Sequence, residues 1–255
     1  MGDGLRLHCA APEGPWKGSL AAPEETEPEE WNGPPVAAPQ LGTWREGAAT
    51  VAHGHTGAVE ALLARLRELP VVPAVRSLED VEEARRRGAA AIFFFKGDVF
   101  GLREALARCG DSGIPVYVHL DLVEGVGKDA AGIRLLRELG AAGVVSTRGP
   151  LLREARAAGL LAIHRVFMVD SEALRTGTAA VRASEPDLVE VLPGLAVPYV
   201  IRELRAAVPH PVIGAGLVTQ PEQVAVILRS GAVGVSASAR RLWGLRIHAA
   251  TAPKP

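Results

Sequence analysis

The sequence predicts a single α/β domain built as a parallel (β/α)8 barrel of the TIM-barrel type. Eight short apolar segments recur between residues 71 and 236, and each is followed by a stretch with helical periodicity. The segments are apolar on both faces, as is typical of parallel strands that helices cover. Eight such units favour a closed barrel. No G-x-G-x-x-G turn follows the first strand, so a dinucleotide-binding open sheet is disfavoured.

The expected elements alternate regularly along the chain. An amphipathic helix comes first, with Val59, Leu62, Leu63, Leu66 and Leu69 on one face. Strands are predicted at 71–75, 90–95, 115–120, 143–147, 161–168, 187–192, 211–214 and 232–236. Helices are predicted at 78–87, 99–108, 129–139, 150–157, 171–183, 196–208 and 221–229, with a last helix starting near Ala239.

Composition divides the chain into three parts. Residues 1–57 hold seven prolines and eight acidic side chains, with few residues able to form a core, and are predicted to be disordered. The barrel is expected at 58–248, with order beginning near Gly57, and 249–255 is expected to be a flexible tail. Two histidines, His53 and His55, have no second pair of ligands nearby, so no metal site is predicted.

Charge and cysteine content restrict the class of protein only loosely. The net charge is −1, but residues 58–255 carry 25 basic and 21 acidic side chains, which suits an anionic ligand or RNA without requiring either. Cys9 and Cys109 form no metal or redox spacing, and Cys109 is expected to be a residue through which a helix packs on its neighbours. The chain lacks a signal-peptide pattern and a membrane-length apolar run, so we expect a cytoplasmic protein with no membrane partner.

The stretch from Pro211 to Ser238 predicts a phosphate site. It reads as strand, Gly-Ala-Gly turn, helix, strand and Ser-Ala-Ser turn. We expect Thr219 to cap the helix, with Pro221 in its first turn and Glu222 completing a capping box. The loops after the last two strands of such barrels commonly bind phosphate through main-chain N–H groups.

Polar groups follow nearly every predicted strand, at the barrel end where ligands bind. Such side chains are costly inside a barrel unless they are paired or bound to a ligand. Two structural alternatives remain open: Arg165 and Glu190 as an internal ion pair, and His119 as a hydrogen-bonded core histidine. The predicted ligand-binding residues are Arg76, Asp98, His119, Asp121, Glu124, Ser146, Thr147, Arg148, Arg165, Glu190, Gly214, Ala215, Gly216, Ser236, Ala237 and Ser238.

No catalytic residues are assigned from the sequence. It contains no G-x-S-x-G motif and no cysteine with a partner histidine, and the only lysines in the barrel segment are Lys96 and Lys128. We therefore expect a non-catalytic protein without a metal or cofactor. An enzyme acting on a small phosphorylated substrate, an isomerase or a lyase, remains the alternative because acids and bases gather at the strand ends.

The order of motifs between Leu69 and Trp243 resembles the glycerol-3-phosphate-responsive antiterminator family of bacterial regulators. The motifs are VVPAVRSLEDVEEA, VYVHLDLVEGVGKDAAGI, GVVSTRGPLL, AIHRVFMVDSEAL, PDLVEVLPG, PVIGAGLV and VGVSASARRLW. The resemblance implies a TIM-barrel-like fold, glycerol 3-phosphate as effector, and binding to the leader mRNA of a glycerol-utilisation operon so that transcription passes a terminator.

The chain departs from that family at several positions. Gln is usual where His164 stands, Ser-Ser where Gly149-Pro150 stand, Gly-Gly where Ala215-Gly216 stand, and Asn near Ala239. The sequence does not locate the RNA surface; Arg85 to Arg87, Arg153 and Arg156 are the arginines considered for it. A homodimer would enlarge a basic surface, and the sequence says nothing about that.

Overall fold

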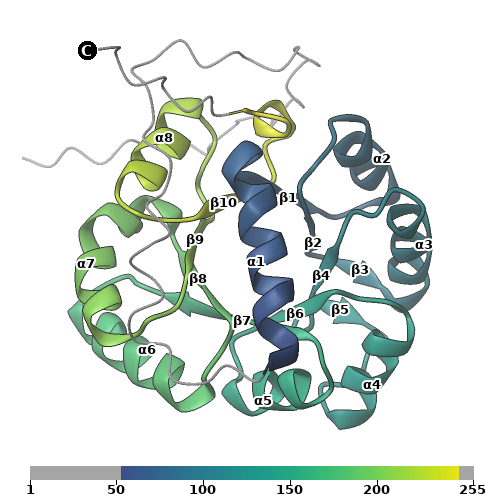
Figure 1. Ribbon diagram of the computed structural model, residues 1–255, viewed down its shortest axis with the longest axis horizontal. Coiled ribbons are helices and arrows are strands. Elements are labelled where there is room, and N and C mark those ends of the chain that lie inside the picture. The colour runs from purple at the N-terminus through teal and green to yellow at the C-terminus, as the bar shows by residue number, and fades with distance from the viewer. Residues whose placement is uncertain (1–52, 247–255) are drawn as a thin grey trace, which may run out of the picture.

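The structure is a computed structural model that describes residues 53–246, and it confirms the closed parallel barrel (Figure 1). Neighbouring strands follow the order β1-β10-β9-β8-β7-β6-β4-β2 around the barrel. The predicted extension up to residue 52 and the tail from 247 lie outside the described residues. The eight strands are β1 (Val71–Val75), β2 (Ile92–Phe94), β4 (Val116–His119), β6 (Gly143–Ser146), β7 (Leu161–Phe167), β8 (Leu188–Leu192), β9 (Val212–Ala215) and β10 (Gly234–Ala237).

Helices cover the outside of the barrel, and they match the predicted segments within a few residues. They are α1 (His53–Glu68), α2 (Leu78–Arg86), α3 (Val99–Gly110), α4 (Ala130–Glu138), α5 (Gly149–Ala157), α6 (Ser171–Ser184), α7 (Val197–Ala207) and α8 (Pro221–Arg229). The first helix starts at His53 rather than near Gly57. The helix expected near Ala239 is a single 3-10 turn, η3 (Arg240–Leu242), and another such turn, η2 (Gly194–Ala196), precedes α7.

Two further strands were not predicted. They are β3 (Gly97–Asp98) and β5 (Val123–Glu124), which pair in parallel with each other in a separate two-stranded sheet. Each follows a barrel strand, so the small sheet joins the loops after β2 and β4 at the carboxyl end of the barrel. Pairing two loops in this way fixes their course relative to the barrel mouth.

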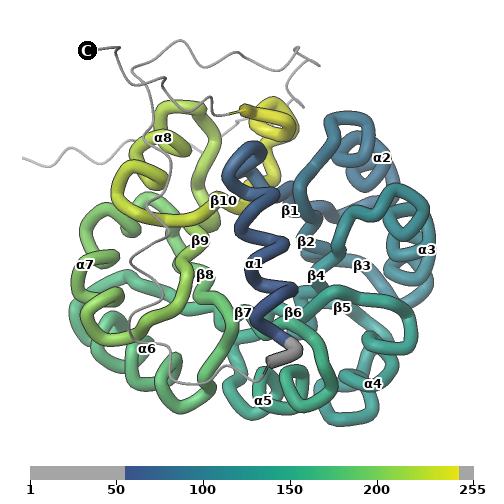
Figure 2. Tube along the Cα trace, viewed as in Figure 1, coloured from purple at the N-terminus to yellow at the C-terminus, as the bar shows by residue number. Residues whose placement is uncertain are grey.

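The first helix closes the end of the barrel at which the strands begin. It runs across the barrel in Figures 1 and 2, and its Leu62 and Leu66 are buried. A Cβ added at Gly234, the first residue of β10, would lie 3.3 Å from Leu66 Cδ1. The side chain of His55 anchors the start of the helix, with its Nε2 3.0 Å from the carbonyl oxygen of Arg156. A ligand must therefore enter from the opposite, carboxyl end.

The cap of α8 differs from the prediction by one residue. Gln220 is the N-cap, and the Oε1 of Gln223 accepts hydrogen bonds from the backbone N–H groups of Thr219 and Gln220, at 2.7 and 3.0 Å. Thr219 and Glu222 therefore do not form the expected capping box. The reason is Pro221, which takes the first helical position because it lacks an N–H to donate, so the cap falls on the residue before it.

Candidate ligand site at the carboxyl end of the barrel

Phe95 lies at the centre of the polar groups that the strands bring together. Its ring meets the His119 ring edge-on, with centroids 5.4 Å apart. The guanidinium carbons of Arg165 and Arg76 lie 5.1 and 5.5 Å from its centroid. Cations favour the face of an aromatic ring. Phe95 was not among the predicted site residues; its place at the end of the Phe93-Phe94-Phe95 run, directly after β2, was the available signal.

Arg165 and Glu190 form a buried ion pair between β7 and β8. They are in register, and Arg165 Nε donates to Glu190 Oε2 at 2.6 Å. The Glu190 side chain is fully buried, and its second oxygen, Oε1, has no hydrogen-bond partner within the described part of the chain. Burial raises the pKa of Glu190, and the positive charge of Arg165 opposes this rise. The two residues therefore form the internal ion pair considered above, and Oε1 of Glu190 lacks a partner among the described residues.

His119 is a buried histidine without hydrogen bonds. It is 3% exposed, and neither Nδ1 nor Nε2 finds a partner among residues 53–246. The hydrogen-bonded core histidine considered above is therefore not what the structure shows. Burial and the nearby Arg165 lower the pKa of His119 to about 4, so the ring is neutral at pH 7 and offers one donor and one acceptor. Buried polar atoms without partners are rare in folded proteins, and a polar ligand would satisfy these.

Asp121 organises the loop that follows β6. Its Oδ2 accepts hydrogen bonds from Ser146 Oγ at 3.0 Å and from the backbone N–H of Thr147 at 2.9 Å. The Ser146 hydroxyl oxygen in turn accepts from the N–H of Arg148 at 3.0 Å. Arg148 Nε lies 3.4 Å from Asp121 Oδ1, and the Arg148 side chain is 54% exposed. Asp121 thus holds a half-exposed cationic side chain beside the mouth.

The loops after β9 and β10 present free main-chain donors. Gly216 has φ +76°, where glycine fits without strain. Within residues 53–246 the N–H groups of Gly216 and Ser238 have no hydrogen-bond acceptor. Ala215 and Ser236 are in register and buried beneath them. The arrangement suits an anion, because unpaired N–H groups in adjacent loops attract negative charge.

Four of the predicted ligand-binding residues, Asp98, Glu124, Gly214 and Ala237, have contacts that support the fold. Asp98 caps α3, accepting from the N–H groups of Phe100 and Gly101, and pairs in the small sheet with Glu124. Gly214 faces the helices, since a Cβ there would lie 2.9 Å from Ile227 Cγ2. Ala237 lies within β10, and its carbonyl oxygen accepts from the indole N–H of Trp243 at 2.8 Å.

The arginines considered for RNA binding are all engaged within the molecule. Arg85, Arg86 and Arg87 contact Glu82 or Glu83 on their own helix. Arg153 and Arg156 of α5 donate to the carbonyl oxygens of Ala183 and Glu185, at the end of α6. Arg182 of α6 repeats the pattern by donating to Ala207, the last residue of α7. These arginines satisfy carbonyl groups that a helix end leaves unpaired.

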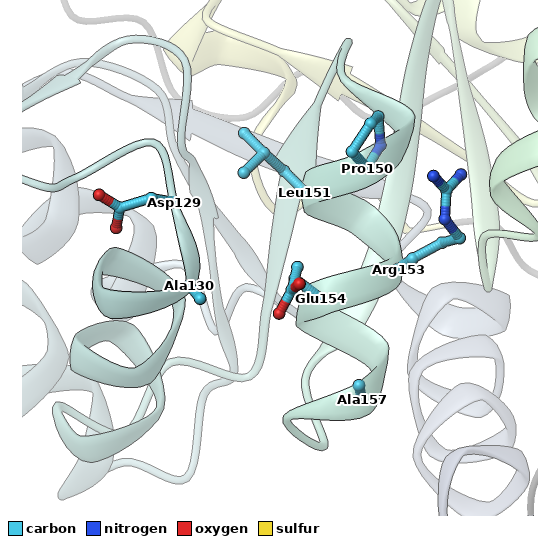
Figure 3. Close-up of a pocket in the computed structure, with 7 residues that line it drawn as sticks. All are labelled: Asp129, Ala130, Pro150, Leu151, Arg153, Glu154 and Ala157. Atoms are coloured by element: carbon cyan, nitrogen blue, oxygen red, sulfur yellow. The ribbon is translucent and has the colours of Figure 1, made fainter.

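Other features of the described residues do not define a site. A groove of about 480 Å³ lies outside the barrel between α4 and α5, lined by Asp129, Pro150 and Arg153 among others (Figure 3). It lies on the outer face of the barrel, and Pro150, which lines it, stands two residues after Arg148. Among residues 53–246 no cluster of acidic, histidine or cysteine side chains is arranged to hold a metal. Cys109 is buried on α3, as expected, and burial raises the pKa of its thiol to about 11.

Fold and mouth together define a closed (β/α)8 barrel whose carboxyl end carries buried, partly unpaired polar groups. The chain belongs to the glycerol-3-phosphate responsive antiterminator family, whose model matches residues 71–243. The resemblance found in the sequence is thereby confirmed. A protein of Escherichia coli K12 named as uncharacterized protein YgcP is 30% identical over 185 residues, which are 72% of this chain and 96% of that protein.

Solved structures agree with the family. The glycerol uptake operon antiterminator regulatory protein of Listeria monocytogenes is 32% identical, with a TM-score of 0.64 over 68% of this chain and 94% of its own. A glycerol uptake operon antiterminator-related protein of Thermotoga maritima is 29% identical, with a TM-score of 0.62 over 70% and 99%. A deoxyribose phosphate aldolase of Aeropyrum pernix, at 14% identity and a TM-score of 0.54 over 73% and 95%, shares the fold alone.

Two of the departures expected from the family resemblance, His164 and Gly149-Pro150, meet at Ser184. His164 points away from the mouth, and its Nδ1 lies 2.7 Å from Ser184 Oγ. Ser184 also packs against Gly149, where an added Cβ would lie 3.2 Å from Ser184 Cβ. Pro150 is in the first turn of α5, where its missing N–H costs no hydrogen bond. The Gly149-Pro150 departure therefore accompanies a local packing arrangement with Ser184 and leaves the backbone of Arg148 anchored to Ser146.

Proposed function

We propose that this protein is a cytoplasmic transcription antiterminator that binds glycerol 3-phosphate in its barrel mouth and, in response, binds the leader mRNA of a glycerol-utilisation operon. Membership of the antiterminator family carries the proposal. The unpaired groups of the mouth support it, because a phosphorylated polyol offers both the anion and the hydroxyls that they lack. No helix within residues 53–246 is long and apolar enough to span a membrane.

The effector phosphate would bind to the N–H groups of Gly216 and Ser238. These donors are unpaired in the described structure, and main-chain amides in adjacent loops bind phosphate without a dedicated side chain. Arg148 would add a positive charge from the opposite loop, since its side chain is half exposed and lies beside Asp121. We leave Ala237 out of the proposed phosphate site, because its main chain belongs to β10.

The two hydroxyl groups would be bound by His119 and Glu190. The neutral ring of His119 supplies a donor and an acceptor, and Glu190 Oε1 supplies a second acceptor. Arg165 favours the charged form of that carboxylate against the effect of burial on its pKa, and its hydrogen bond holds the carboxylate in place. The site therefore distinguishes a phosphorylated polyol from inorganic phosphate, because phosphate alone leaves these buried atoms unsatisfied.

Effector binding would act on RNA through the loops of the mouth. The effector must bind more tightly to the RNA-competent arrangement of these loops than to the other, since a ligand shifts an equilibrium only by its difference in affinity. The loop of Thr147 and Arg148 is the element best placed for this, because one hydrogen-bond network, centred on Asp121, fixes it.

A mobility-shift assay with the leader RNA tests the proposal. We expect glycerol 3-phosphate, but neither glycerol nor inorganic phosphate, to raise RNA affinity by about tenfold, within the usual range of coupling between sites. Arg148→Ala should abolish the effect, whereas Arg134→Ala, which removes an exposed arginine of α4, should preserve it. The salt concentration must be held constant, because RNA affinity depends strongly on it.

The same assay separates the regulator from the alternative enzyme. An isomerase or lyase would convert a triose phosphate and show no effector-dependent RNA shift. A Schiff-base mechanism has little support, because Lys96 and Lys128, the two lysines within residues 53–246, are both exposed. Turnover of a triose phosphate together with no RNA shift would replace the proposed regulator by the enzyme.

A further inference from the structure

Three loops at the carboxyl end of the barrel expose a cluster of large apolar side chains. Of the eight such side chains exposed within residues 53–246, five lie at the end of β7, between the end of β8 and the first turn of α7, or just after β9. We call these five the apolar arc. They are Phe167, Val169, Leu195, Tyr199 and Leu217, with exposed fractions of 54, 72, 38, 83 and 71%. Single exposed apolar residues need no explanation, whereas clusters mark interaction sites.

The three loops that carry the apolar arc are bonded to each other. Strands β7, β8 and β9 are neighbours in the barrel. The N–H of Met168 donates to the carbonyl oxygen of Leu192 at 2.7 Å, which joins the first loop to the end of β8. The N–H of Gly194 donates to the carbonyl oxygen of Gly216 at 3.1 Å, which joins the second loop to the third. These hydrogen bonds fix the positions of the three loops relative to each other.

Leu217 is held in a strained backbone conformation. Its φ is +61°, in the left-handed region that residues other than glycine, asparagine and aspartate rarely adopt. Such a conformation costs about 1 kcal/mol or more. The side chain remains 71% exposed, so its burial within the described part of the chain offsets little of that cost. A bulky apolar side chain projected at such a cost indicates a contact outside the protomer.

The charge of these loops selects the kind of partner. Residues 166–169, 192–200 and 214–221 contain no charged side chain, and the neighbouring Asp170 is engaged as the N-cap of α6. A cation contacts the edge of the third loop: Arg241 donates from Nε and Nη2 to the carbonyl oxygen of Thr219, at 2.9 and 2.6 Å, so its guanidinium is engaged there. RNA binding depends on several cationic side chains that neutralise phosphates, and the five side chains of the arc carry no charge. A surface that meets its own copy brings identical groups together, so uncharged side chains suit it.

We propose that a second copy of this chain docks on the apolar arc, forming a two-fold symmetric dimer in which the two arcs face each other. The interface has the composition of an interface core, apolar and aromatic with no charge. It borders the candidate ligand site, because Phe167 follows Arg165 by two residues on the same strand. The dimer thus covers one side of each mouth and leaves the side of Arg148 open to solvent.

Sedimentation of the full chain tests the dimer. We expect the wild type to sediment at about twice 26.7 kDa at micromolar concentration. Tyr199→Glu should weaken association more than tenfold, because it places like charges across the two-fold axis. The substitution lies in the first turn of α7, where an acidic residue favours the helix, so folding should persist.

A second variant and a matched control complete the test. Leu217→Asn should also weaken association more than tenfold while fitting the left-handed backbone. Val226→Glu should leave association unchanged, because Val226 is an exposed apolar residue on α8 outside the arc.

Three results would overturn the proposal. The wild type could remain a monomer up to about 100 μM. A dimer could persist in both arc variants, which would place the interface elsewhere. The arc variants of a monomeric wild type could instead lose affinity for leader RNA, which would make the arc an RNA surface.

Discussion

Several buried polar atoms of the barrel mouth lack hydrogen-bond partners, which lowers the stability of the folded protein. Glu190 is fully buried with one oxygen unpaired, and both nitrogens of His119 lack partners among the described residues. Each such atom costs free energy that a hydrogen bond would recover. A site that is under-satisfied when empty gains most from a ligand with matching groups. We expect glycerol 3-phosphate to stabilise the folded protein for this reason.

The buried ion pair gives the first prediction. Arg165→Met should lower the free energy of unfolding by about 3–5 kcal/mol at pH 8, because it leaves the Glu190 carboxylate buried without its partner. Burial already raises the pKa of Glu190, so the variant should recover stability as the pH falls and this carboxyl takes up a proton. Urea denaturation at several pH values measures the effect.

The double variant Arg165→Met/Glu190→Met is the control for that prediction. It should be close to the wild type in stability, since apolar residues of similar size replace both charges. A single-variant cost below about 1 kcal/mol would instead mean that the pair is solvated.

The neutral state of His119 gives the second prediction. Its pKa is about 4 in the folded protein and about 6.5 in an unfolded chain, so the unfolded state binds more protons between these values. Wild-type stability should therefore fall as the pH drops from about 6.5 to 4, by up to about 3 kcal/mol from this residue. His119→Gln should remove that part of the pH dependence. Parallel pH dependence in the two proteins would show that the ring is solvated.

At the scale of elements, two glycines in equivalent positions of their helices differ in the space available for a side chain. Gly101 in α3 and Gly132 in α4 each donate an N–H to an aspartate that caps the helix, Asp98 and Asp129. A Cβ at Gly132 would lie 1.8 Å from the carbonyl oxygen of Gly127, whereas at Gly101 its nearest neighbour would be 3.5 Å away. Only Gly132 is therefore required by a close approach of two backbones.

The third prediction compares these glycines. Gly132→Ala should destabilise the protein by about 1–3 kcal/mol, because the loop at Gly127 must move. Gly101→Ala should stabilise it by about 0.5–1 kcal/mol, since alanine loses less entropy in a helix. Thermal and urea unfolding of both variants give the comparison. If both variants changed the free energy of unfolding by the same amount, the start of α4 would be able to move away from the loop at Gly127 at little cost.

How far the sequence predicts each element depends on whether the cause is local. Periodicity located all eight barrel strands, because strands apolar on both faces are a local signal. The cap of α8 was misplaced by one residue because Pro221 competes with Thr219 for the helix start. The pair of β3 and β5 could not be predicted, since it depends on contact between two loops whose paired residues, such as Gly97 and Val123, are 26 positions apart in the sequence.

The site was predictable in its residue types but not in its contacts. Arg165, Glu190 and His119 stand at strand ends, which the sequence shows. The role of Phe95 required knowing that three strands bring His119, Arg165 and Arg76 around one ring. The close packing of Gly214 against the helices could not be predicted either, because a glycine in a sequence does not indicate which face of its strand lacks space for a side chain.

For the whole molecule, the two ends of the barrel have separate tasks. The amino end is closed by α1 and by arginines that bond the ends of neighbouring helices, and the carboxyl end carries the polar mouth and the apolar arc. Such a division between a stabilising and a functional end is usual for this fold.

The fourth prediction tests this division. Leu66→Ala should lower the free energy of unfolding by about 2–5 kcal/mol, because Leu66 of α1 is buried against the start of β10. It should leave the affinity for glycerol 3-phosphate unchanged under conditions where the variant is folded. Calorimetric titration of the folded variant measures that affinity. A large loss of affinity would mean that the ends are coupled.

Calorimetric titration of the wild-type protein with glycerol 3-phosphate tests the central claim most directly. The account predicts one binding site per chain, with affinity reduced more than tenfold in Arg148→Ala and unchanged in Arg134→Ala. No measurable binding, or binding that is indifferent to Arg148, would contradict the placement of the effector in the barrel mouth.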